Sequence, residues 1–329
     1  MEMRRIQITG GASYMITLPK EWADSSGLKK NEMIGTEVQG DGTLLLVPKG
    51  VQREERSTKV INADGISGDT LYRRLVGAYI SGHGSLEVRA TTLNNEAYTT
   101  TLSFTQATIG MEVIEEDDDH ILIKDLMDHA EIKPSKNIER MGVIVHRMIS
   151  DVFEFMTTRN TTLLEGMESR DQEIDRIYWL ISRQSNIYQK TPALCKRTGL
   201  ELYKLTRHQL VGRIIERIGD HIVLVSDDLL TLHKHNKSGT ADKGLREIGK
   251  GIMELFSMTL SGWMKQDRDV AESSIEKSKE LIKEIKKAFE VKESDHDIEN
   301  AMNLFAGSSK RVAEYCIDIS ELTINASMD

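Results

Sequence analysis

Cysteine is nearly absent from this sequence, and long apolar runs are missing altogether. The two cysteines, Cys195 and Cys316, lie far apart, without the close spacing of metal ligands. This excludes a disulfide framework and a cysteine zinc site. No stretch is apolar enough to cross a membrane, and residues 1–8 are not followed by the apolar run of a secretory signal. We therefore expect a cytoplasmic protein without membrane insertion.

Aromatic residues and an excess of basic charge are also lacking. Aromatics make up 5% of the 329 residues, against 39% hydrophobic and 29% charged residues, which is typical of a folded, helix-rich protein. At about 150 residues per domain, this length predicts two or three domains. Lys and Arg number 43 against 52 Asp and Glu, a net charge of -9. An acidic chain is poorly suited to coating nucleic acid, so any DNA contact must be local.

Only four prolines occur, and each marks a change in pattern, because proline interrupts helices and central strands. They are Pro19, Pro48, Pro134 and Pro192. The chain divides accordingly into segments 1–50, 57–132, 136–234 and 241–327. The first segment consists of short strand-like runs with a helical turn at 20–26, and strand signals disappear after residue 135.

The second segment mixes strand and helix patterns. Strand patterns at 59–62 and 85–90 alternate with helical patterns at 69–81 and 95–108, and a hairpin follows at 112–114 and 121–123. The acidic run 115–119 falls at the tip of this hairpin, where polar turn residues are expected, so we interpret it as a turn rather than a metal loop. The pattern predicts a small βαβαββ module.

The last two segments carry apolar residues at alternating spacings of three and four, the pattern of packed bundle helices. The residues around Glu216 reappear around Glu314, an offset of 98 (314 − 216). Such an offset favours a duplicated three-helix bundle over a short solenoid repeat. We predict helices at 136–159, 162–190 and 199–234 in one bundle and at 241–265, 268–290 and 295–327 in the other.

Two of these helices present rows of carboxylates. At about 100° per residue, one row falls on one edge of the second helix and another on one face of the third. The rows are Glu168, Asp171 and Asp175, and Glu216, Asp220 and Asp227. Clustered oxygen ligands suit Mg, Mn or Fe, and without interleaved histidines zinc is less expected. On spacing alone, a hydrated acidic face of an acidic protein is the favoured interpretation, and a metal site is the alternative.

Three stretches of the bundle segments resemble the PhoU family of phosphate-uptake regulators. They are ESRDQEIDRIYWLISR (168–183), RIIERIGDHIVLVSDD (213–228) and SSKRVAEYCIDISELTIN (308–325). The resemblance implies two tandem three-helix bundles that bind multinuclear metal clusters through acids four residues apart. These acids correspond here to Asp171 with Asp175, Glu216 with Asp220, and Glu314 with Asp318. It implies iron or manganese first, with zinc or magnesium as alternatives, and a phosphate transporter ATPase or a sensor kinase as partner.

The fifth predicted helix departs from this family pattern. The positions expected to carry acids hold Ser273, Ser274, Ser278 and Ile282. The acids next to these positions are Glu272, Glu276 and Glu280, which do not take the family's places, so a metal site in the second bundle has less support than one in the first.

The opening segment, with GGASYMITLPKEWADSSGLKKNEMI (10–34) and GTLLLVPKG (42–50), resembles the AbrB/MazE/SpoVT domain. That resemblance implies a homodimer of swapped strand hairpins that contacts DNA. The DNA-binding candidates are Arg4, Arg5, Ser13, Tyr14, Lys20, Lys29 and Lys30. Residues 1–50 hold six Lys and Arg and six Asp and Glu, a weak electrostatic footprint. A dimerisation module that never meets DNA therefore stays an alternative.

Together these features predict an α+β N-terminal region, made of a swapped-hairpin β head and a βαβαββ module, followed by an all-α pair of three-helix bundles. We expect a phosphate-responsive regulator that binds metal on its bundles and DNA through its N-terminal dimer. The alternative is an AbrB-type repressor or antitoxin-like protein whose bundles only oligomerise. Enzyme motifs are lacking, since the single Glu-x-x-His spacing, Glu293 to His296, cannot form a di-iron site and no phosphate loop follows a strand, so we expect no enzyme.

Overall fold

The computed structural model describes residues 2–11, 13–38, 42–48, 57–191, 194–195, 198–234, 240–289 and 296–328. It divides into two compact units, Met1–Ser57 and Thr58–Asp329. Each unit is described by itself below. None of the helices in the described residues is long and apolar enough to cross a membrane.

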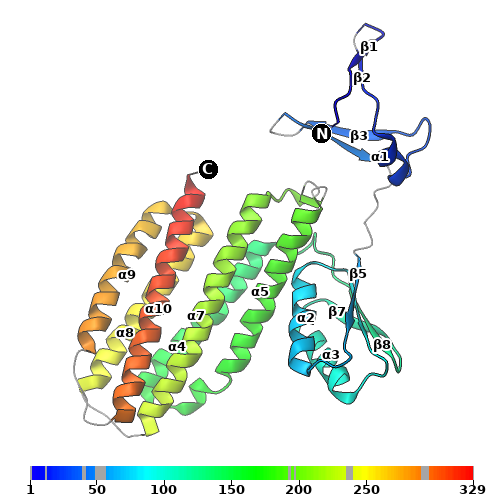
Figure 1. The fold of residues 1–329 in the computed structure, drawn as a ribbon. Helices are drawn as coiled ribbons and strands as arrows, with labels where there is room; N and C mark the ends of the chain where they lie inside the picture. The colour runs from blue at the N-terminus through cyan, green and yellow to red at the C-terminus, as the bar shows by residue number, and fades with distance from the viewer. Residues whose placement is uncertain are drawn as a thin grey trace. The chain divides into compact units, whose positions relative to one another are not determined.

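The N-terminal unit consists of two antiparallel hairpins and one short helix (Figure 1). Strands β1 (Gln7–Thr9) and β2 (Ser13–Met15) form the first hairpin, and β3 (Ile34–Val38) and β4 (Leu44–Pro48) form the second. Helix α1 (Lys20–Ser25) follows Pro19, and Gly27 behind it has a φ of 66°. None of the described residues of this unit is buried, so it has no core of its own.

The second unit begins with a four-stranded sheet in the order β5-β6-β8-β7. Its strands are β5 (Thr58–Asn62), β6 (Ser85–Arg89), β7 (Met111–Glu116) and β8 (His120–Asp125). Strand β5 pairs with β6 in parallel, and the other pairs are antiparallel. Helices α2 (Gly68–Ile80) and α3 (Asn95–Ala107) cover one face of the sheet (Figure 1). These elements confirm the predicted βαβαββ module.

Local sequence explains where the two module helices begin. Ser67 accepts a hydrogen bond from the backbone N–H of Thr70 at the start of α2, and Asn94 accepts one from Ala97 at the start of α3. Between the helices and the sheet lies a core that includes Leu75, Tyr79, Leu86, Phe104 and Ile121. The acidic run begins in the last two residues of β7, Glu115 and Glu116, and its three aspartates, 117–119, lie in the turn between β7 and β8, as predicted for the hairpin tip.

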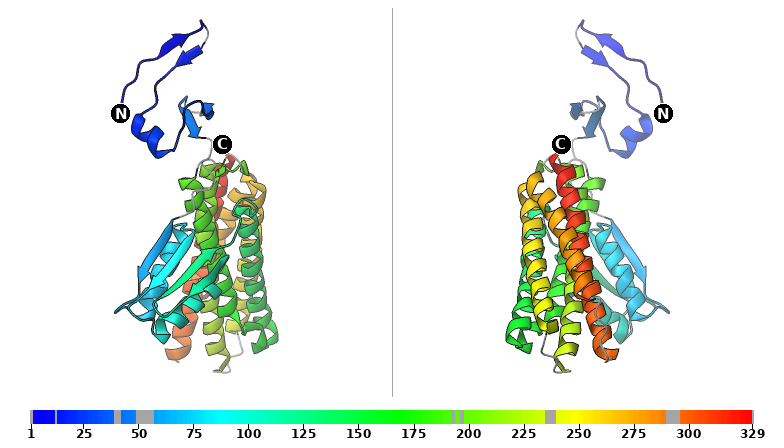
Figure 2. Two further views of the ribbon diagram at one scale, coloured as in Figure 1. Left: turned by 90° about the vertical axis from the view of Figure 1, so that its right-hand side faces the viewer. Right: turned by 90° about the vertical axis from the view of Figure 1, so that its left-hand side faces the viewer.

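Long helices make up the rest of the unit and lie roughly side by side (Figure 2). They are α4 (Pro134–Thr158), α5 (Met167–Lys190), α7 (Leu202–Lys234), α8 (Thr240–Lys265), α9 (Arg268–Ala288) and α10 (His296–Ser327). The predicted apolar stripes are buried in a single continuous core, which runs from Ile138 on α4 through Ile215 on α7 to Ile319 on α10. The fold class predicted from the sequence is therefore confirmed.

Two predicted helix starts are wrong. The second helix of the first bundle starts at Met167 rather than at 162, and the third starts at Leu202 rather than at 199. Residues Thr161–Leu164 form a separate 3-10 turn, η1, and Gly166 adopts a left-handed φ of 74°. Glycine is the residue that adopts this conformation at no steric cost, so the helix is interrupted here although the apolar pattern of the sequence continues across this point.

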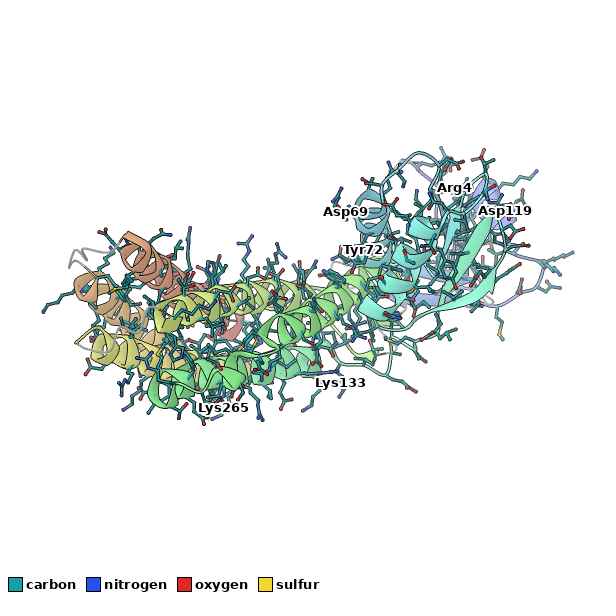
Figure 3. The ribbon with its side chains drawn as sticks, turned by 90° about the horizontal axis from the view of Figure 1, so that it is seen from below. Arg4, Asp69, Tyr72, Asp119, Lys133 and Lys265 are labelled. Atoms are coloured by element: carbon teal, nitrogen blue, oxygen red, sulfur yellow. The ribbon has the colours of Figure 1, made fainter. Side chains whose placement is uncertain are left out.

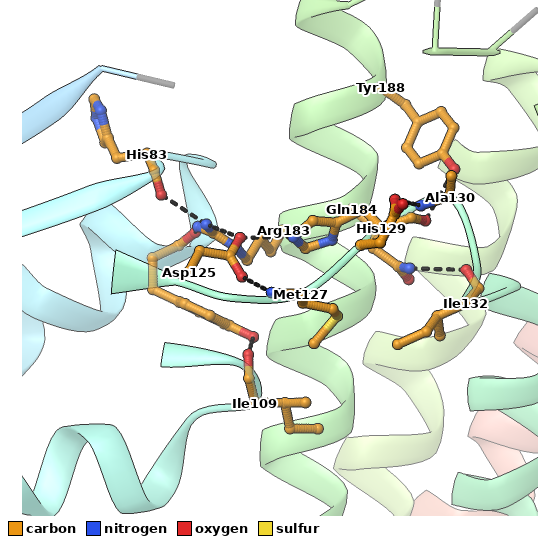
Figure 4. A network of polar contacts seen from close by, with 12 residues as sticks. His83, Ile109, Asp125, Met127, His129, Ala130, Ile132, Arg183, Gln184 and Tyr188 are labelled. Atoms are coloured by element: carbon orange, nitrogen blue, oxygen red, sulfur yellow. Dashed lines mark hydrogen bonds and ion pairs between the residues drawn. The ribbon is translucent and has the colours of Figure 1, made fainter. Parts of the chain in front are cut away.

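The sheet module is joined to the bundle by a buried polar network on α5 (Figure 4). The fully buried Arg183 donates hydrogen bonds to the carbonyl of Tyr79, to the carbonyl of His83 at 2.6 Å and to the Asp125 carboxylate at 2.7 Å. Asp125 also contacts His129 Nε2 at 2.7 Å. Although burial opposes ionisation, the hydrogen bond from His129 and the charge of Arg183 hold the pKa of Asp125 well below its ordinary value. Helix α5 thus belongs to the bundle and also carries the module.

Candidate metal site on the first bundle

Helices α5 and α7 bring four of the predicted carboxylates into one electrostatically coupled group. Asp171 and Asp175 lie one turn apart on α5, and Glu216 and Asp220 lie one turn apart on α7. We call these four residues the α5/α7 acid cluster. Charge on Asp220 acts on all three of the others, and charge on Asp175 acts on Asp171 and Glu216. The helical spacing identified in the sequence therefore corresponds to real proximity between the two helices.

Glycine on α7 makes this close approach possible. A Cβ atom at Gly219 would lie 3.0 Å from both Asp171 Oδ1 and Ile174 Cδ1, closer than real Cβ contacts normally come. Two turns earlier, a Cβ atom at Gly212 would meet Ile181 and Ile138 at 3.4 Å. The contacts at Gly212 are ordinary van der Waals distances, so the absence of a side chain at Gly219 is what seats α5 against α7 and places the Asp171 carboxylate directly over the α7 backbone.

Burial and mutual repulsion both make ionisation of the cluster unfavourable. Burial, followed by the charges of Asp220 and Asp175, raises the pKa of Asp171 to about 7. Burial and Asp220 raise the pKa of Glu216 to about 7, although Arg213 opposes the shift. The pKa of Asp175 is raised to about 6 for the same two reasons. A cation at the cluster would reverse these shifts, since it favours the ionised form.

Hydrogen bonding leaves part of the cluster unsatisfied. Asp171 Oδ1 and Glu216 Oε2 are buried and have no hydrogen-bond partner among the residues that the structure describes. The other Glu216 oxygen, Oε1, accepts a hydrogen bond from Arg213 Nη1 at 2.7 Å. A buried carboxylate oxygen without a donor is costly, and a hard cation is a group that satisfies it. The donor set therefore fits a divalent or trivalent metal.

The four carboxylates do not yet form a compact ligand cage. Within the described part of the chain, three ligand atoms of different residues come within 4.8 Å of one another only at Asp117, Asp119 and His120. That group lies at the turn between β7 and β8 and its two aspartates are exposed, as an ordinary acidic turn would be (Figure 3 labels Asp119). Binding of an ion between α5 and α7 would require side-chain rotation to converge the oxygens.

Other predicted ligands lie outside the cluster. Glu168 is exposed in the first turn of α5. Glu314 and Asp318 lie on α10, where Glu314 pairs with Arg311 at 3.0 Å and Lys310 at 3.2 Å. Burial, Glu321 and Glu314 raise the pKa of Asp318. The α10 carboxylates thus form a second acidic group that interacts with basic neighbours.

The second bundle holds hydroxyl groups where acids would complete a site. Ser274 and Ser278 are fully buried on α9, and Ser274 Oγ lies 2.6 Å from Thr259 Oγ1 on α8. The acids of that helix, Asp269, Glu272, Glu276, Glu280 and Glu284, are all exposed. The α10 acids therefore lack a facing carboxylate row from α9.

Several residues around the first cluster were not predicted from the sequence. Tyr72 on α2 has its pKa raised by burial and by the charge of Asp175, so the module helix borders the cluster (Figure 3 labels Tyr72). Asp228, rather than the exposed Asp227, is the partly buried acid further along α7, and burial followed by Asp227 raises its pKa to about 6. Helical periodicity could have distinguished Asp228 from Asp227, but nothing in the sequence indicates that α2 lies against α5.

His221 lies next to the cluster on α7. Its Nδ1 is buried without a hydrogen-bond partner, and its ring lies 5.7 Å from that of Tyr315 on α10. Burial lowers its pKa, although the charge of Asp220 opposes the shift. The contact with Tyr315 indicates a residue of the α7–α10 interface.

The predicted DNA-binding residues of the N-terminal unit differ in their surroundings. Arg4 is held internally, because it donates to Thr17 Oγ1 at 3.1 Å and to Glu2 Oε1 at 2.6 Å. The others are exposed: Arg5, Ser13, Tyr14, Lys20, Lys29 and Lys30. Arg4 therefore stabilises its own unit, whereas the side chains of the other six residues are accessible to a ligand.

Comparisons with known proteins bear out both resemblances. Residues 138–229 match the PhoU domain model, and residues 7–53 match the model for the MazE bacterial antitoxin that takes part in antidote-toxin recognition. A phosphate-specific transport system accessory protein PhoU homolog of Caulobacter vibrioides is 32% identical over 93 residues. Those residues cover 28% of this chain and 38% of that protein, so the match spans well under half of the relative's length.

Among solved structures, the crystal structure of PhoU from Pseudomonas aeruginosa resembles the bundles. It superposes with a TM-score of 0.52 at 20% identity and covers 58% of this chain and 93% of that one. At this level of identity the likeness shows the fold alone, which here is the pair of helical bundles.

Proposed function

We propose that this protein is a cytoplasmic, non-catalytic regulator of phosphate uptake of the PhoU type. The observation that carries the proposal is the α5/α7 acid cluster, which lies inside the segment that matches the PhoU domain. The protein acts with the phosphate transport system, through a transporter ATPase or a sensor kinase. The name of the Caulobacter vibrioides relative, an accessory protein of a phosphate-specific transport system, supports this assignment.

Metal binding supplies the proposed link to phosphate. Asp171, Asp175, Glu216 and Asp220 would hold a hard cation, iron or manganese first and zinc or magnesium as alternatives. The buried oxygens without donors on Asp171 and Glu216 support this choice of ligands. A bound cation turns an acidic face into one that attracts phosphate or an anionic partner surface. Glu314 and Asp318, which lack a facing acidic row, contribute a weaker second site.

The N-terminal unit is the part of the protein that we propose binds DNA. The lack of buried residues in the described part of this unit supports a homodimer, since a hairpin unit gains a core only by packing against another surface. The exposed Arg5, Lys20, Lys29 and Lys30 would contact DNA phosphates, with Ser13 and Tyr14 as hydrogen-bond donors. The regulator would thus join a phosphate-sensing bundle to a DNA-binding dimer.

The match of residues 7–53 to MazE favours a second candidate, a DNA-binding repressor or antitoxin whose bundles only oligomerise. Elemental analysis separates the two functions. Protein purified without chelator should contain iron, manganese, zinc or magnesium, and added Mn²⁺ should raise its melting temperature, because a ligand that binds only the folded state stabilises it.

Paired variants locate the metal. Asp171→Asn with Glu216→Gln should abolish both the metal content and the stabilisation. The matched control, Glu272→Gln with Glu276→Gln, removes two exposed acids of α9 and should leave both unchanged. Metal-free protein that no metal stabilises, but that still binds its promoter, would favour the repressor.

A further inference from the structure

The sheet module contains a basic pocket that lies apart from the acid cluster. The pocket has a volume of about 470 Å³, within the range of small-molecule sites. It lies between the edge strand β5 and helix α2 and extends to the turn that follows α2. Its lining residues are Lys59, Val60, Ile61, Asn62, Arg74, Ala78, Ser81 and His83.

The charge of this lining is of one sign. Lys59 and Arg74 line the pocket, and no acidic residue does. Neither side chain forms an ion pair or hydrogen bond with any of the described residues. In a chain with a net charge of -9, two cations that line one pocket without an acidic partner among the described residues are a local reversal of charge. Such a pair attracts an anion, and a guanidinium together with an ammonium suits a phosphate group.

The nearby acids are occupied elsewhere. Glu87 lies opposite Val60 in the β5–β6 register and pairs with Arg89, its neighbour on β6. Asp64, just beyond the end of β5, accepts hydrogen bonds from the backbone N–H and hydroxyl of Thr91. The positive charge of the pocket is therefore available to a ligand.

The rim of the pocket is held in place by α5. Arg183 and Lys190 on α5 donate to the carbonyls of His83 and Ser81, at 2.6 and 2.7 Å. Figure 4 shows the His83 imidazole pointing away from Arg183 while its carbonyl faces Arg183. A Cβ atom at Gly82 would lie 2.8 Å from Ile187 Cγ1, so the turn is also packed tightly on α5. A rim fixed in this way lowers the ordering cost of binding.

We infer that this pocket binds a small organic phosphate. The phosphate lies between Lys59 and Arg74, a hydrogen bond comes from the side-chain amide N–H of Asn62, whose Oδ1 accepts from Asp64 N–H, and the carbon skeleton contacts Val60, Ile61 and Ala78. An organic phosphate fits better than inorganic phosphate, because inorganic phosphate would not fill the volume of the pocket and has no carbon atoms to contact its apolar residues. The pocket is a ligand-binding site separate from the metal cluster. The inference does not depend on whether the cluster binds metal.

Isothermal titration calorimetry and thermal shift on the full chain test this assignment. The probes are AMP, glucose 6-phosphate, glycerol 3-phosphate, inorganic phosphate and unphosphorylated adenosine. At least one organic phosphate should bind and raise the melting temperature, whereas adenosine should not bind. Absence of binding by all three organic phosphates at millimolar concentration would overturn the assignment, and so would equal binding of inorganic phosphate.

Neighbouring arginines on α2 provide a matched pair of variants. Arg74→Gln and Lys59→Gln should each weaken binding about tenfold or more, since each removes a charge-assisted contact. Arg73→Gln removes the same charge one residue away, where Arg73 is exposed and donates to Thr70 rather than lining the pocket, and should leave binding unchanged. Equal loss in Arg73→Gln and Arg74→Gln would reveal general charge attraction and refute a built site. Unchanged binding in the variant with Asp171→Asn and Glu216→Gln separates this pocket from the metal cluster.

Discussion

Arg183 and Asp125 form a salt bridge of 2.7 Å in which the two side chains are 0% and 1% exposed. One lies at the centre of the bundle helix α5 and the other at the end of strand β8. A buried pair of this kind adds little net stability over an apolar contact, but loss of one partner is severe because the other charge stays buried. The pair therefore fixes which face of the module meets the bundle.

Arg183→Met should destabilise the second unit by about 3–5 kcal/mol, the cost of leaving one charge of a buried pair uncompensated. Denaturant unfolding followed by circular dichroism measures this change. Arg140→Met is the control, because Arg140 pairs with Glu173 at the surface, with side chains 58% and 40% exposed. That pair should be worth about 1 kcal/mol or less. Similar losses in the two variants would show that the network does not hold the module.

The raised pKa values of the acid cluster predict that the folding stability of metal-free protein depends on pH in an unusual direction. The folded pKa values of Asp171 and Glu216, about 7, lie above their ordinary values near 4. Between about pH 4 and pH 7 the folded state therefore binds more protons than the unfolded state, so stability falls as the pH rises through this window. The contribution of these carboxyls is fully present below pH 4 and is lost above pH 7.

Melting temperatures of metal-free protein at pH 5 and pH 7.5 test whether stability falls as the pH rises. The wild type should lose several degrees over this interval, and the variant with Asp171→Asn and Glu216→Gln should lose clearly less. Saturating Mn²⁺ should remove the loss, because a cation favours the ionised carboxylates. A wild type that gains stability towards pH 7.5 relative to the double variant would contradict the raised pKa values.

The sequence was sufficient for most elements and for the composition of the cluster, because both depend on local periodicity. The three- and four-residue spacing identified α7, and the same spacing placed Glu216 and Asp220 on one face. The helix interruption at Gly166 was missed because the apolar pattern continues through it. The contacts of Arg183 and Tyr72 were missed because they join residues about a hundred positions apart, which no periodicity encodes.

Gly219→Ala tests whether close packing of α5 on α7 is required for the cluster. The added methyl group would lie 3.0 Å from Asp171 Oδ1 and Ile174 Cδ1. Overpacking of this kind should destabilise the protein by about 1–3 kcal/mol and reduce its metal content. Gly307→Ala on α10 is the matched control, since nothing lies within 4 Å of its added Cβ. That variant should be neutral or up to about 1 kcal/mol more stable, because alanine favours the helix. Equal effects of the two substitutions would exclude steric packing at Gly219.

The exposed apolar side chains of the N-terminal unit predict that two copies of the protein associate through this surface. Ile8 and Ile16 are 68% and 51% exposed, although this unit has no buried residue among those described. Burying one such side chain is worth about 1.5–3 kcal/mol, so dimerisation through this surface would supply the missing core. Ile8→Glu with Ile16→Glu should convert the dimer to monomer in sedimentation velocity experiments and abolish DNA binding. Ile114→Glu introduces the same charge at a residue of β7 that is 49% exposed, and it should leave the dimer intact. A double variant that still sediments as a dimer would place the interface on the helical bundles instead.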